Sequence, residues 1–278
     1  MQEGSQKVIL AQLPEGAKVR EKTSGVIFLI GEHNHPGYQG TTLVADHVLG
    51  QGCLDAPEDR NPDQRLHLTG YNYYAFCNLH QWLNAEDEDW YQPAHEFDAP
   101  PTEENLARRP NAYDSHGYND YAKKPGFLSW FGEAFREAIF ESEMPCTNRP
   151  QNAIEFVRAR AFLLSTAEAG IRTSDPLQEG SKIAVFNDFR NRVTTPSAEA
   201  VAASDWQPAY LSVRNLFWYW LRTPKLNDAG FTYYAHTSCP YSHKFSCCPW
   251  VGIRPALNVD SQLPVAASQN VGGLFLIG

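Results

Sequence analysis

Short apolar segments, separated by loops rich in Gly, Pro, Asn and acidic residues, are the feature that most constrains how this chain of 278 residues folds. The segments "VIFLI" (26–30) and "TLVAD" (42–46) have the composition of strands, and a Gly/His/Pro-rich loop joins them. "LFWYWLRT" (216–223) is apolar almost throughout, as in a strand buried on both faces. "VGIRPALNV" (251–259) alternates apolar residues with a period of two, and "VRARAFLLS" (157–165) is a further predicted strand.

Two stretches follow the helical period instead. The first carries apolar residues at spacings of three and seven, at Phe76, Leu79 and Leu83. The second has Ser129 as its predicted cap and Glu133 in its first turn. Its apolar stripe consists of Phe131, Ala134, Phe135, Ala138 and Ile139. Strands, two helices and then further strands indicate an α+β domain.

The segment between the two predicted helices, residues 90–125, is rich in Pro, Tyr, Asn and acidic residues. Such a composition predicts a long irregular loop insertion with a functional or decorative role, outside the core.

Charge and hydropathy limit the classes of partner. Lys and Arg number 23 against 32 Asp and Glu, and a net charge of -9 without a basic cluster argues against binding nucleic acid. The apolar runs are too short to span a bilayer. The first residues lack the basic and apolar regions of a signal peptide, so we expect synthesis in the cytoplasm.

Motifs of catalysis are missing from the sequence, which has no G-x-S-x-G, Walker, G-x-G-x-x-G or HExxH pattern. Asp114, Ser115 and His116 are adjacent, whereas a catalytic triad is assembled from separated positions. The many acidic residues include no pair that stands out. We therefore expect a protein that is not an enzyme and uses no cofactor.

One stretch near the C-terminus has an unusual composition. Twelve of the sixteen residues from Tyr233 to Cys248 are Tyr, His, Ser, Cys or Phe, although these types make up only 59 of the 278 residues. One interpretation is a zinc-binding domain or a metalloenzyme, because the side chains of His236, Cys239, His243 and Cys247 are ligands that zinc prefers. The missing C-x2-C knuckle and the adjacent Cys247 and Cys248 argue against a zinc site. Adjacent cysteines argue against a disulfide knot as well.

A second interpretation explains the whole stretch. Asn codons whose adenines are randomised reach Tyr, His, Ser, Cys, Phe, Thr, Ala and Pro, but never Lys, Glu, Gln, Met or Trp. Between Phe231 and Pro249, only Lys244 belongs to the excluded types. Tyr, His and small polar residues are also common on recognition surfaces. This interpretation predicts a diversified binding surface, and a surface loop without a special role is the third alternative.

Together with the "GIRPALNV" that follows it, the stretch resembles the variable region of proteins diversified by diversity-generating retroelements. The chain from about residue 20 to about residue 260 resembles a widespread family of phage and gut-bacterial domains of unknown function. The matching pieces are "VIFLIGEHNHPGYQGTTL", "NLHQWLN", "KPGFLSWFGEAFREAI", "ARAFLLSTAEAG", "EGSKIAVF", "YWLRTP" and "GIRPALNV".

This resemblance implies a C-type-lectin-like domain at residues 20–260, with two helices, antiparallel strands and long irregular loops. An N-terminal segment (1–19) would precede the domain, a tail (261–278) would follow it, and residues 231–250 would be the variable region. The tail could close the sheet or mediate assembly. Calcium-dependent sugar binding is not implied, because the E-P-N, Q-P-D and W-N-D tripeptides are missing.

The function implied by the resemblance is non-enzymatic binding of a host-surface protein or glycan by an exposed hypervariable face, on a phage virion or a bacterial cell. The oligomeric state and the host are not indicated. Trp218, Trp220, Arg222, Arg254 and Pro255 would belong to the scaffold. The residues carried over to the ligand-binding face are Tyr233, Tyr234, His236, Ser238, Cys239, Tyr241, Ser242, His243, Phe245, Ser246, Cys247 and Cys248.

Overall fold

The computed structural model describes residues 8–107, 120–173, 177–203, 217–236, 241–266 and 274–278. Strands dominate and the helices are short, which confirms the predicted α+β class.

The largest sheet has eight strands in the order β1-β12-β13-β2-β3-β4-β11-β7. Neighbouring strands are antiparallel except for β13 and β2, which are parallel. The strands are β1 (Val8–Ile9), β2 (Lys18–Glu21), β3 (Ile27–His33), β4 (Thr41–Ala45), β7 (Ala161–Leu163), β11 (Pro255–Val259), β12 (Pro264–Val265) and β13 (Phe275–Ile277). Both ends of the chain therefore contribute strands to the main sheet, and the described part of the tail extends that sheet.

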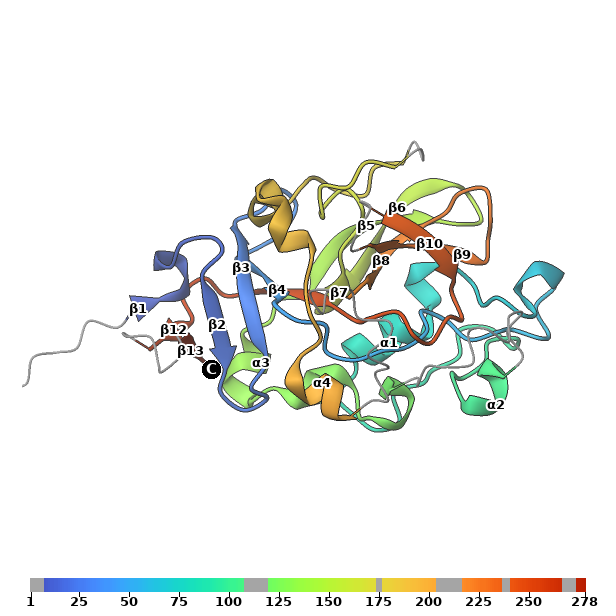
Figure 1. Cartoon of the computed structure of the whole chain (residues 1–278), viewed down its shortest axis with the longest axis horizontal. Helices are drawn as coiled ribbons and strands as arrows, with labels where there is room; N and C mark the ends of the chain where they lie inside the picture. Colours follow the sequence, from blue (N-terminus) through green and yellow to red (C-terminus); the bar gives the residue numbers. More distant parts are fainter. Residues whose placement is uncertain (1–7, 108–119, 174–176, 204–216, 237–240, 267–273) are drawn as a thin grey trace, which may run out of the picture.

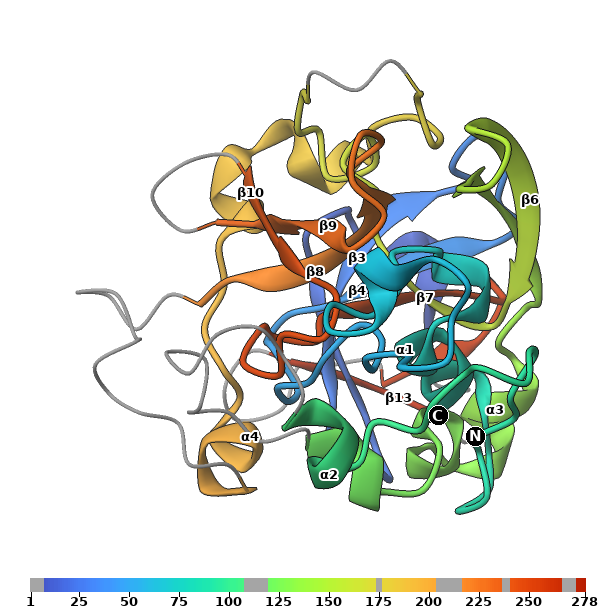
Figure 2. The same ribbon diagram turned by 90° about the vertical axis from the view of Figure 1, so that its right-hand side faces the viewer.

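Two smaller antiparallel sheets complete the strand architecture. One has the order β10-β9-β8, and the other is a ribbon of β5 and β6. Their bounds are β5 (Ser142–Asn148), β6 (Ala153–Ala159), β8 (Tyr219–Pro224), β9 (Phe231–Ala235) and β10 (Tyr241–Phe245). Figure 1 shows the terminal strands at one end of the long axis and the three-stranded sheet toward the other. In Figure 2, β6 and β10 lie on opposite sides of the view.

The strands expected from sequence are present, with two differences of detail. "VRARAFLLS" does not form one strand: β6 ends at Ala159 and β7 begins at Ala161, in a different sheet. All five residues of β11 are buried, so the strand is covered on both faces. The apolar alternation in its sequence therefore does not mark one face toward the core and one toward solvent. The predicted neighbours β3 and β4 pair directly, and β8 is buried along its whole length.

Helices are short throughout the described residues. They are α1 (Asn78–Asn84), α2 (Glu103–Leu106), α3 (Glu133–Glu137) and α4 (Ala198–Ala203). Turns of 3-10 helix occur at Leu10–Gln12, Gln64–Leu66, Tyr74–Phe76, Asp120–Lys123, Phe127–Trp130, Ala184–Asn187 and Phe189–Arg192. The first predicted helix is present as α1, with Leu79 and Leu83 buried. Phe76 lies outside it and is 39% exposed, because the extended backbone of Cys77 separates the 3-10 turn from α1.

The second predicted helix is wrong in its length. The stretch breaks into the turn Phe127–Trp130 and the helix α3, since Phe131 and Gly132 are extended. Gly132, not Ser129, is the N-cap, and a Cβ atom there would lie 2.5 Å from the Thr23 hydroxyl oxygen. The close approach of the β2–β3 connection leaves no room for a Cβ atom here, and the extended backbone of Gly132 bounds the helix on its N-terminal side.

The segment 90–125, predicted to lie outside the core, contributes to the core in its described part. Trp90, Leu106 and Tyr121 are buried, and the Tyr121 ring lies 5.3 Å from that of Trp82 in α1. The backbone is irregular as expected, but its aromatic and apolar side chains pack beneath it. The composition, rich in Pro and acidic residues, thus predicted the irregular backbone of this segment but not the burial of its aromatic and apolar side chains.

Candidate ligand-binding surface

The stretch with the unusual composition folds into a hairpin of β9 and β10. Phe231 pairs with Phe245, Tyr233 with His243, and Ala235 with Tyr241. Strand β9 lies between β8 and β10, so β10 is the edge strand of this sheet within the described residues. Aromatic residues favour strands because their rings pack well on a pleated, half-buried surface.

One face of the hairpin is a ladder of five rings, since alternate residues of a strand share a face. We call this set, Phe231, Tyr233, Tyr241, His243 and Phe245, the aromatic ladder. The ring centroids of Phe231 and Phe245 are 4.2 Å apart, and those of Tyr233 and Tyr241 are 5.3 Å apart in an edge-to-face arrangement. Such cross-strand pairs stabilise a hairpin by about 0.2–1 kcal/mol each.

The opposite face carries a second group of rings. His236 stacks on Trp218 with a centroid distance of 5.6 Å, and Trp218 meets Trp250 edge-to-face at 5.1 Å. Tyr234 lies 5.8 Å from His236. Partial burial lowers the pKa of His236, so this imidazole is neutral at pH 7.

A lysine accompanies the rings on each face. The ammonium nitrogen of Lys225 is 3.2 Å from Nε2 of His243 and 5.3 Å from the centroid of the Phe231 ring. On the other face, the Lys244 ammonium lies 4.7 Å from the centroid of the Trp250 ring. These are distances at which a cation is attracted to the face of an aromatic ring.

The twelve residues expected on an exposed face divide into three groups. Five are half-buried and available at the surface: His236, Tyr241, Ser242, His243 and Phe245. Five are buried, which contradicts the expectation that they are exposed: Tyr233, Tyr234, Ser246, Cys247 and Cys248. Ser238 and Cys239 lie outside the described residues.

Burial has a different cause in β9 and in the residues that follow β10. Tyr233 and Tyr234 belong to the central strand β9, which has neighbours on both sides. After β10, the chain passes under the segment 54–69. The Ser246 carbonyl accepts hydrogen bonds from the amides of Leu54 and Asp55, and the Cys247 amide donates to the Thr69 carbonyl. Residues held by backbone bonds on this side are covered and do not present their side chains to solvent.

The structure does not gather the described members of the proposed zinc set. His236 and His243 lie on opposite faces of the hairpin, among different rings. The Cys247 thiol is buried and donates to the Leu68 carbonyl at 3.3 Å. Within the described ranges, no group of three or more His, Cys, Asp or Glu side chains is arranged to hold a metal ion. The fourth member, Cys239, lies outside those ranges.

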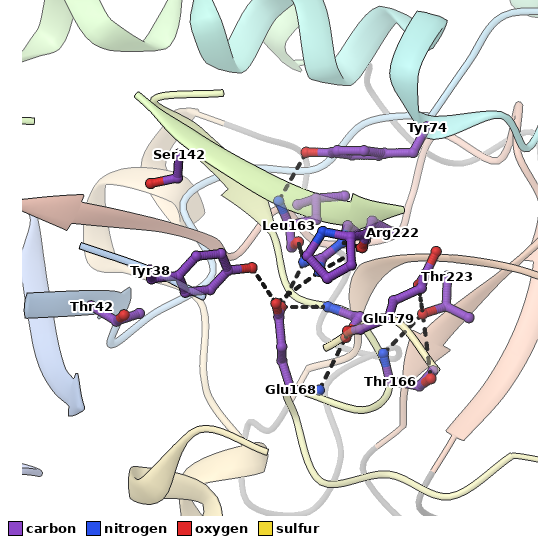
Figure 3. Close-up of polar contacts among 12 residues, drawn as sticks. Tyr38, Thr42, Tyr74, Ser142, Leu163, Thr166, Glu168, Glu179, Arg222 and Thr223 are labelled. Carbon is purple, nitrogen blue, oxygen red and sulfur yellow. Dashed lines mark hydrogen bonds and ion pairs between the residues drawn. The ribbon is translucent and has the colours of Figure 1, made fainter. Parts of the chain in front are cut away.

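Beneath the hairpin, a buried ion pair anchors strand β8. The Arg222 guanidinium donates to both carboxylate oxygens of Glu168, at 2.6 and 2.7 Å, and both side chains are fully buried (Figure 3). Arg222 also donates to the carbonyls of Leu163, at 2.8 Å, and Pro145, at 3.1 Å. The Tyr38 hydroxyl donates to Glu168 from the other side. A buried charge is tolerated only when its hydrogen bonds are satisfied in this way.

A second buried acid extends this group. Glu179 accepts a hydrogen bond from the Thr223 hydroxyl (Figure 3). It also accepts one from the Thr147 amide, at 2.6 Å. The Thr223 oxygen in turn accepts from the Thr166 amide at 2.9 Å. Burial raises the pKa of Glu179. We call the set of Tyr38, Glu168, Glu179, Arg222 and Thr223 the Arg222 network. It joins β8 to β5 and to the segment after β7.

Arg254 anchors the other flank of the hairpin through carbonyl oxygens and an aromatic ring. It donates to the carbonyls of Ala45, at 2.8 Å, and Asn191, at 2.9 Å, and its guanidinium lies 5.0 Å from the centroid of the Tyr219 ring. The Trp220 indole nitrogen donates to the Gly52 carbonyl at 2.8 Å. The buried positions of Trp220, Arg222, Arg254 and Pro255 agree with the expected scaffold role.

Sequence reasoning missed three residues of this surface. Trp218 was expected in the scaffold, yet it is half-buried and stacks on His236. Lys225 precedes the unusual stretch, and Trp250 lies at the end of the predicted variable region 231–250 but outside the twelve residues carried over to the binding face. Their position next to that stretch is the signal that could have found them, because residues flanking a hairpin often complete its faces.

The fold and the surface together define an α+β domain that displays an aromatic hairpin on a polar, buried anchor. No helix in the described parts of the chain has both the length and the apolar character needed to cross a membrane. A family model described as "Domain of unknown function (DUF6273)" matches residues 39–261, and the chain belongs to this family. No curated protein and no solved structure matches the chain.

Proposed function

We propose that the protein is a non-enzymatic binding protein whose β9–β10 hairpin contacts a ligand, a protein or glycan, on a host surface. The observation that carries the proposal is the exposed side of the hairpin. There, Tyr241, His243 and Phe245 are half-buried on the edge strand, with their rings already packed against neighbours. Rings held in this way lose little conformational entropy on binding, which is why Tyr is common on recognition surfaces.

The proposal includes diversification of the gene by a retroelement. Support comes from the contrast between the hairpin and the strands that flank it. The pieces "YWLRTP" and "GIRPALNV" contain the buried strands β8 and β11, and Arg222 and Arg254 attach them to distant carbonyls. A surface can vary without unfolding only if its base is also held by contacts outside it, and Arg222 and Arg254 supply such contacts to β8 and to the segment that leads into β11.

The proposed contact set is smaller than the set of twelve. It contains the half-buried His236, Tyr241, Ser242, His243 and Phe245, together with the flanking Trp218 and Trp250. Tyr233 and Tyr234 would support these residues from β9. A C-type-lectin-like architecture, a phage or prophage gene, and display on a virion or a cell surface complete the proposal.

Deep sequencing of the 3′ end of the gene in a growing population tests the diversification. We expect substitutions at adenine positions of a nearby near-copy of the segment, concentrated in the codons of His236, Tyr241, Ser242, His243 and Phe245. The codons of Arg222 and Arg254 should be constant and serve as the internal control. If the hairpin codons are as constant as those two, retroelement diversification is contradicted.

Adsorption to cells tests the binding itself. Fluorescently labelled full-length protein is added to intact bacterial cells from the community in which the gene occurs, and bound label is counted by flow cytometry. The double variant Tyr241→Ala/His243→Ala should lose at least about tenfold of the bound label while its melting temperature falls by no more than about 5 °C. Equal adsorption of the variant and the parent would contradict the contact set.

A further inference from the structure

A cleft of about 390 Å³ opens between the β3–β4 loop, the β5–β6 ribbon and the segment around residue 180. Its volume lies within the range of pockets that hold small organic molecules, about 300–1,000 Å³. Tyr38 lies on one side, Pro145 and Phe156 lie on the other, and the buried Glu168 is at the inner end. The ribbon that forms one wall is on the opposite side of the view from β10 in Figure 2, so the cleft is separate from the hairpin surface.

The ribbon wall presents an exposed aromatic ring to the cleft. Residues alternate along β6, and Phe156 and Ile154 point away from the core, with Phe156 69% exposed. The cross-strand partner of Phe156 is Pro145, which also lines the cleft. A large exposed ring beside a concave surface is the kind of anchor that small ligands use.

The facing wall holds its ring in a fixed position. The Tyr38 hydroxyl donates to Glu168, and the Tyr38 ring lies 5.3 Å from both the Phe162 ring and the His35 ring (Figure 3 shows the hydroxyl contact). Because Arg222 binds the Glu168 carboxylate, the acceptor of the Tyr38 hydroxyl is held in a fixed position. The Tyr38 ring is therefore preorganised, and a ligand would lose little entropy in ordering it.

Charge in the cleft favours a cation. Among the described residues that line it, none is Lys or Arg, while Glu143 contributes a carboxylate. Arg158 donates to Glu143 at 3.3 Å and lies 3.9 Å from Glu141, which is outside the cleft lining, so these two acids and one arginine together leave this rim with a net negative charge. Glu168 is already neutralised by Arg222. An anion would be repelled here, whereas an ammonium group next to Glu143 would be attracted.

We infer that this cleft binds a small organic cation, with its ammonium group beside Glu143 and its apolar body between the rings of Tyr38 and Phe156. The two rings supply apolar contact area and attraction to the positive charge. The inference does not rest on the function proposed for the hairpin. A failure of the cleft to bind cations would leave the proposed function of the hairpin unchanged, and the reverse holds as well.

Isothermal titration calorimetry of the full chain with three matched compounds at low salt tests the inference. Phenethylammonium is the probe, and 2-phenylethanol and phenylacetate are its neutral and anionic counterparts. We expect phenethylammonium to bind, phenylethanol to bind at least about fivefold more weakly, and phenylacetate to give no heat of binding.

Variants locate the binding. Phe156→Ala should weaken the affinity for phenethylammonium about three- to tenfold. Glu143→Gln should remove most of the preference of the cleft for phenethylammonium over phenylethanol. Phe189→Ala, at a ring that is also 69% exposed but outside the cleft lining, and Glu104→Gln, at an exposed acid elsewhere, are the matched controls and should change nothing. Circular dichroism confirms that each variant is folded.

Three outcomes would overturn the inference. They are an absence of phenethylammonium binding, equal binding of phenylacetate, and an affinity that neither Phe156→Ala nor Glu143→Gln changes.

Discussion

The Arg222 network and the β9–β10 hairpin are neighbours through strand β8, yet they use polar and aromatic groups in opposite ways. In the network, charged groups are fully buried, and Arg222 and Glu168 are bound on several sides. In the hairpin, rings such as Tyr241 and Phe245 are half-buried and pack against one another. A buried charge tolerates almost no replacement of its partners, whereas packing between surface rings tolerates many.

The comparison also divides the hairpin itself. Strand β9 is central and its Tyr233 and Tyr234 are buried, while the edge strand β10 is half-buried from Tyr241 to Phe245. The boundary between the buried scaffold and the accessible surface therefore runs between β9 and β10. Sensitivity to substitution should fall in order from the network to β9 and then to β10.

The largest effect is expected at Arg222. Arg222→Ala should lower the free energy of unfolding by about 3–5 kcal/mol, because it leaves the Glu168 carboxylate buried without its partner. Urea denaturation measures this loss. Arg158→Ala, an exposed arginine on β6, is the control and should cost less than about 0.5 kcal/mol. A loss below about 1 kcal/mol for Arg222→Ala would mean that the network does not anchor β8.

The next effect separates the two strands of the hairpin. Tyr233→Ala should lower the free energy of unfolding by about 3 kcal/mol, since the ring is 3% exposed and its removal leaves a cavity. Tyr241→Ala, its neighbour across the strands in the aromatic ladder, should cost less than about 1 kcal/mol. Denaturant titrations of both variants make the comparison. Equal losses in the free energy of unfolding would show that the boundary between scaffold and surface does not run between β9 and β10.

A smaller effect concerns pH. Burial, followed by the nearby Asp55 carboxylate, raises the pKa of Glu58 to about 9, and burial also raises the pKa of Asp55. The folded state thus retains protons that the unfolded chain loses above its ordinary carboxyl pKa near 4. Stability should therefore fall as pH rises from about 5 to about 9.

Thermal unfolding at several pH values measures this slope. Glu58→Gln should flatten it, because the amide carries no titrating proton and removes the repulsion of Asp55. Glu104→Gln, at an exposed acid, should leave the slope as it is. A slope that is the same in the parent and in Glu58→Gln would show that other groups cause it.

The smallest effect is expected at Lys244 on the edge strand. Lys244→Met should cost about 0.5–1 kcal/mol, because it removes the cation 4.7 Å from the Trp250 ring and keeps the length of the side chain. Lys244→Arg should retain the stability of the parent. The measurement is the difference in melting temperature between these two variants. A difference of zero would show that the contact between Lys244 and the Trp250 ring does not stabilise the fold.

Much of the architecture could be predicted from the sequence because it depends on local patterns. The apolar runs predicted as strands at 26–30 and 216–223 overlap β3 and β8, because short apolar runs of this kind are typical of strands buried on both faces. The composition of 233–248 singled out the segment that carries the candidate surface, although it did not predict that this segment folds into a hairpin. By contrast, the close approach of Thr23 to Gly132 joins positions more than a hundred residues apart in the chain, and no local pattern records it.

The tertiary structure alone decided which residues of the surface are exposed and which partners the buried charges have. Composition treats Tyr233 and Tyr241 alike, but the neighbours of β9 bury one of them, and the edge position of β10 leaves the other at the surface. Likewise, Arg222 is a lone basic residue in the sequence, and only folding brings Glu168 and Pro145 to it. Strand order and long-range burial follow from packing of the whole chain, and this is why the local sequence predicted the elements and only the fold determined the sites.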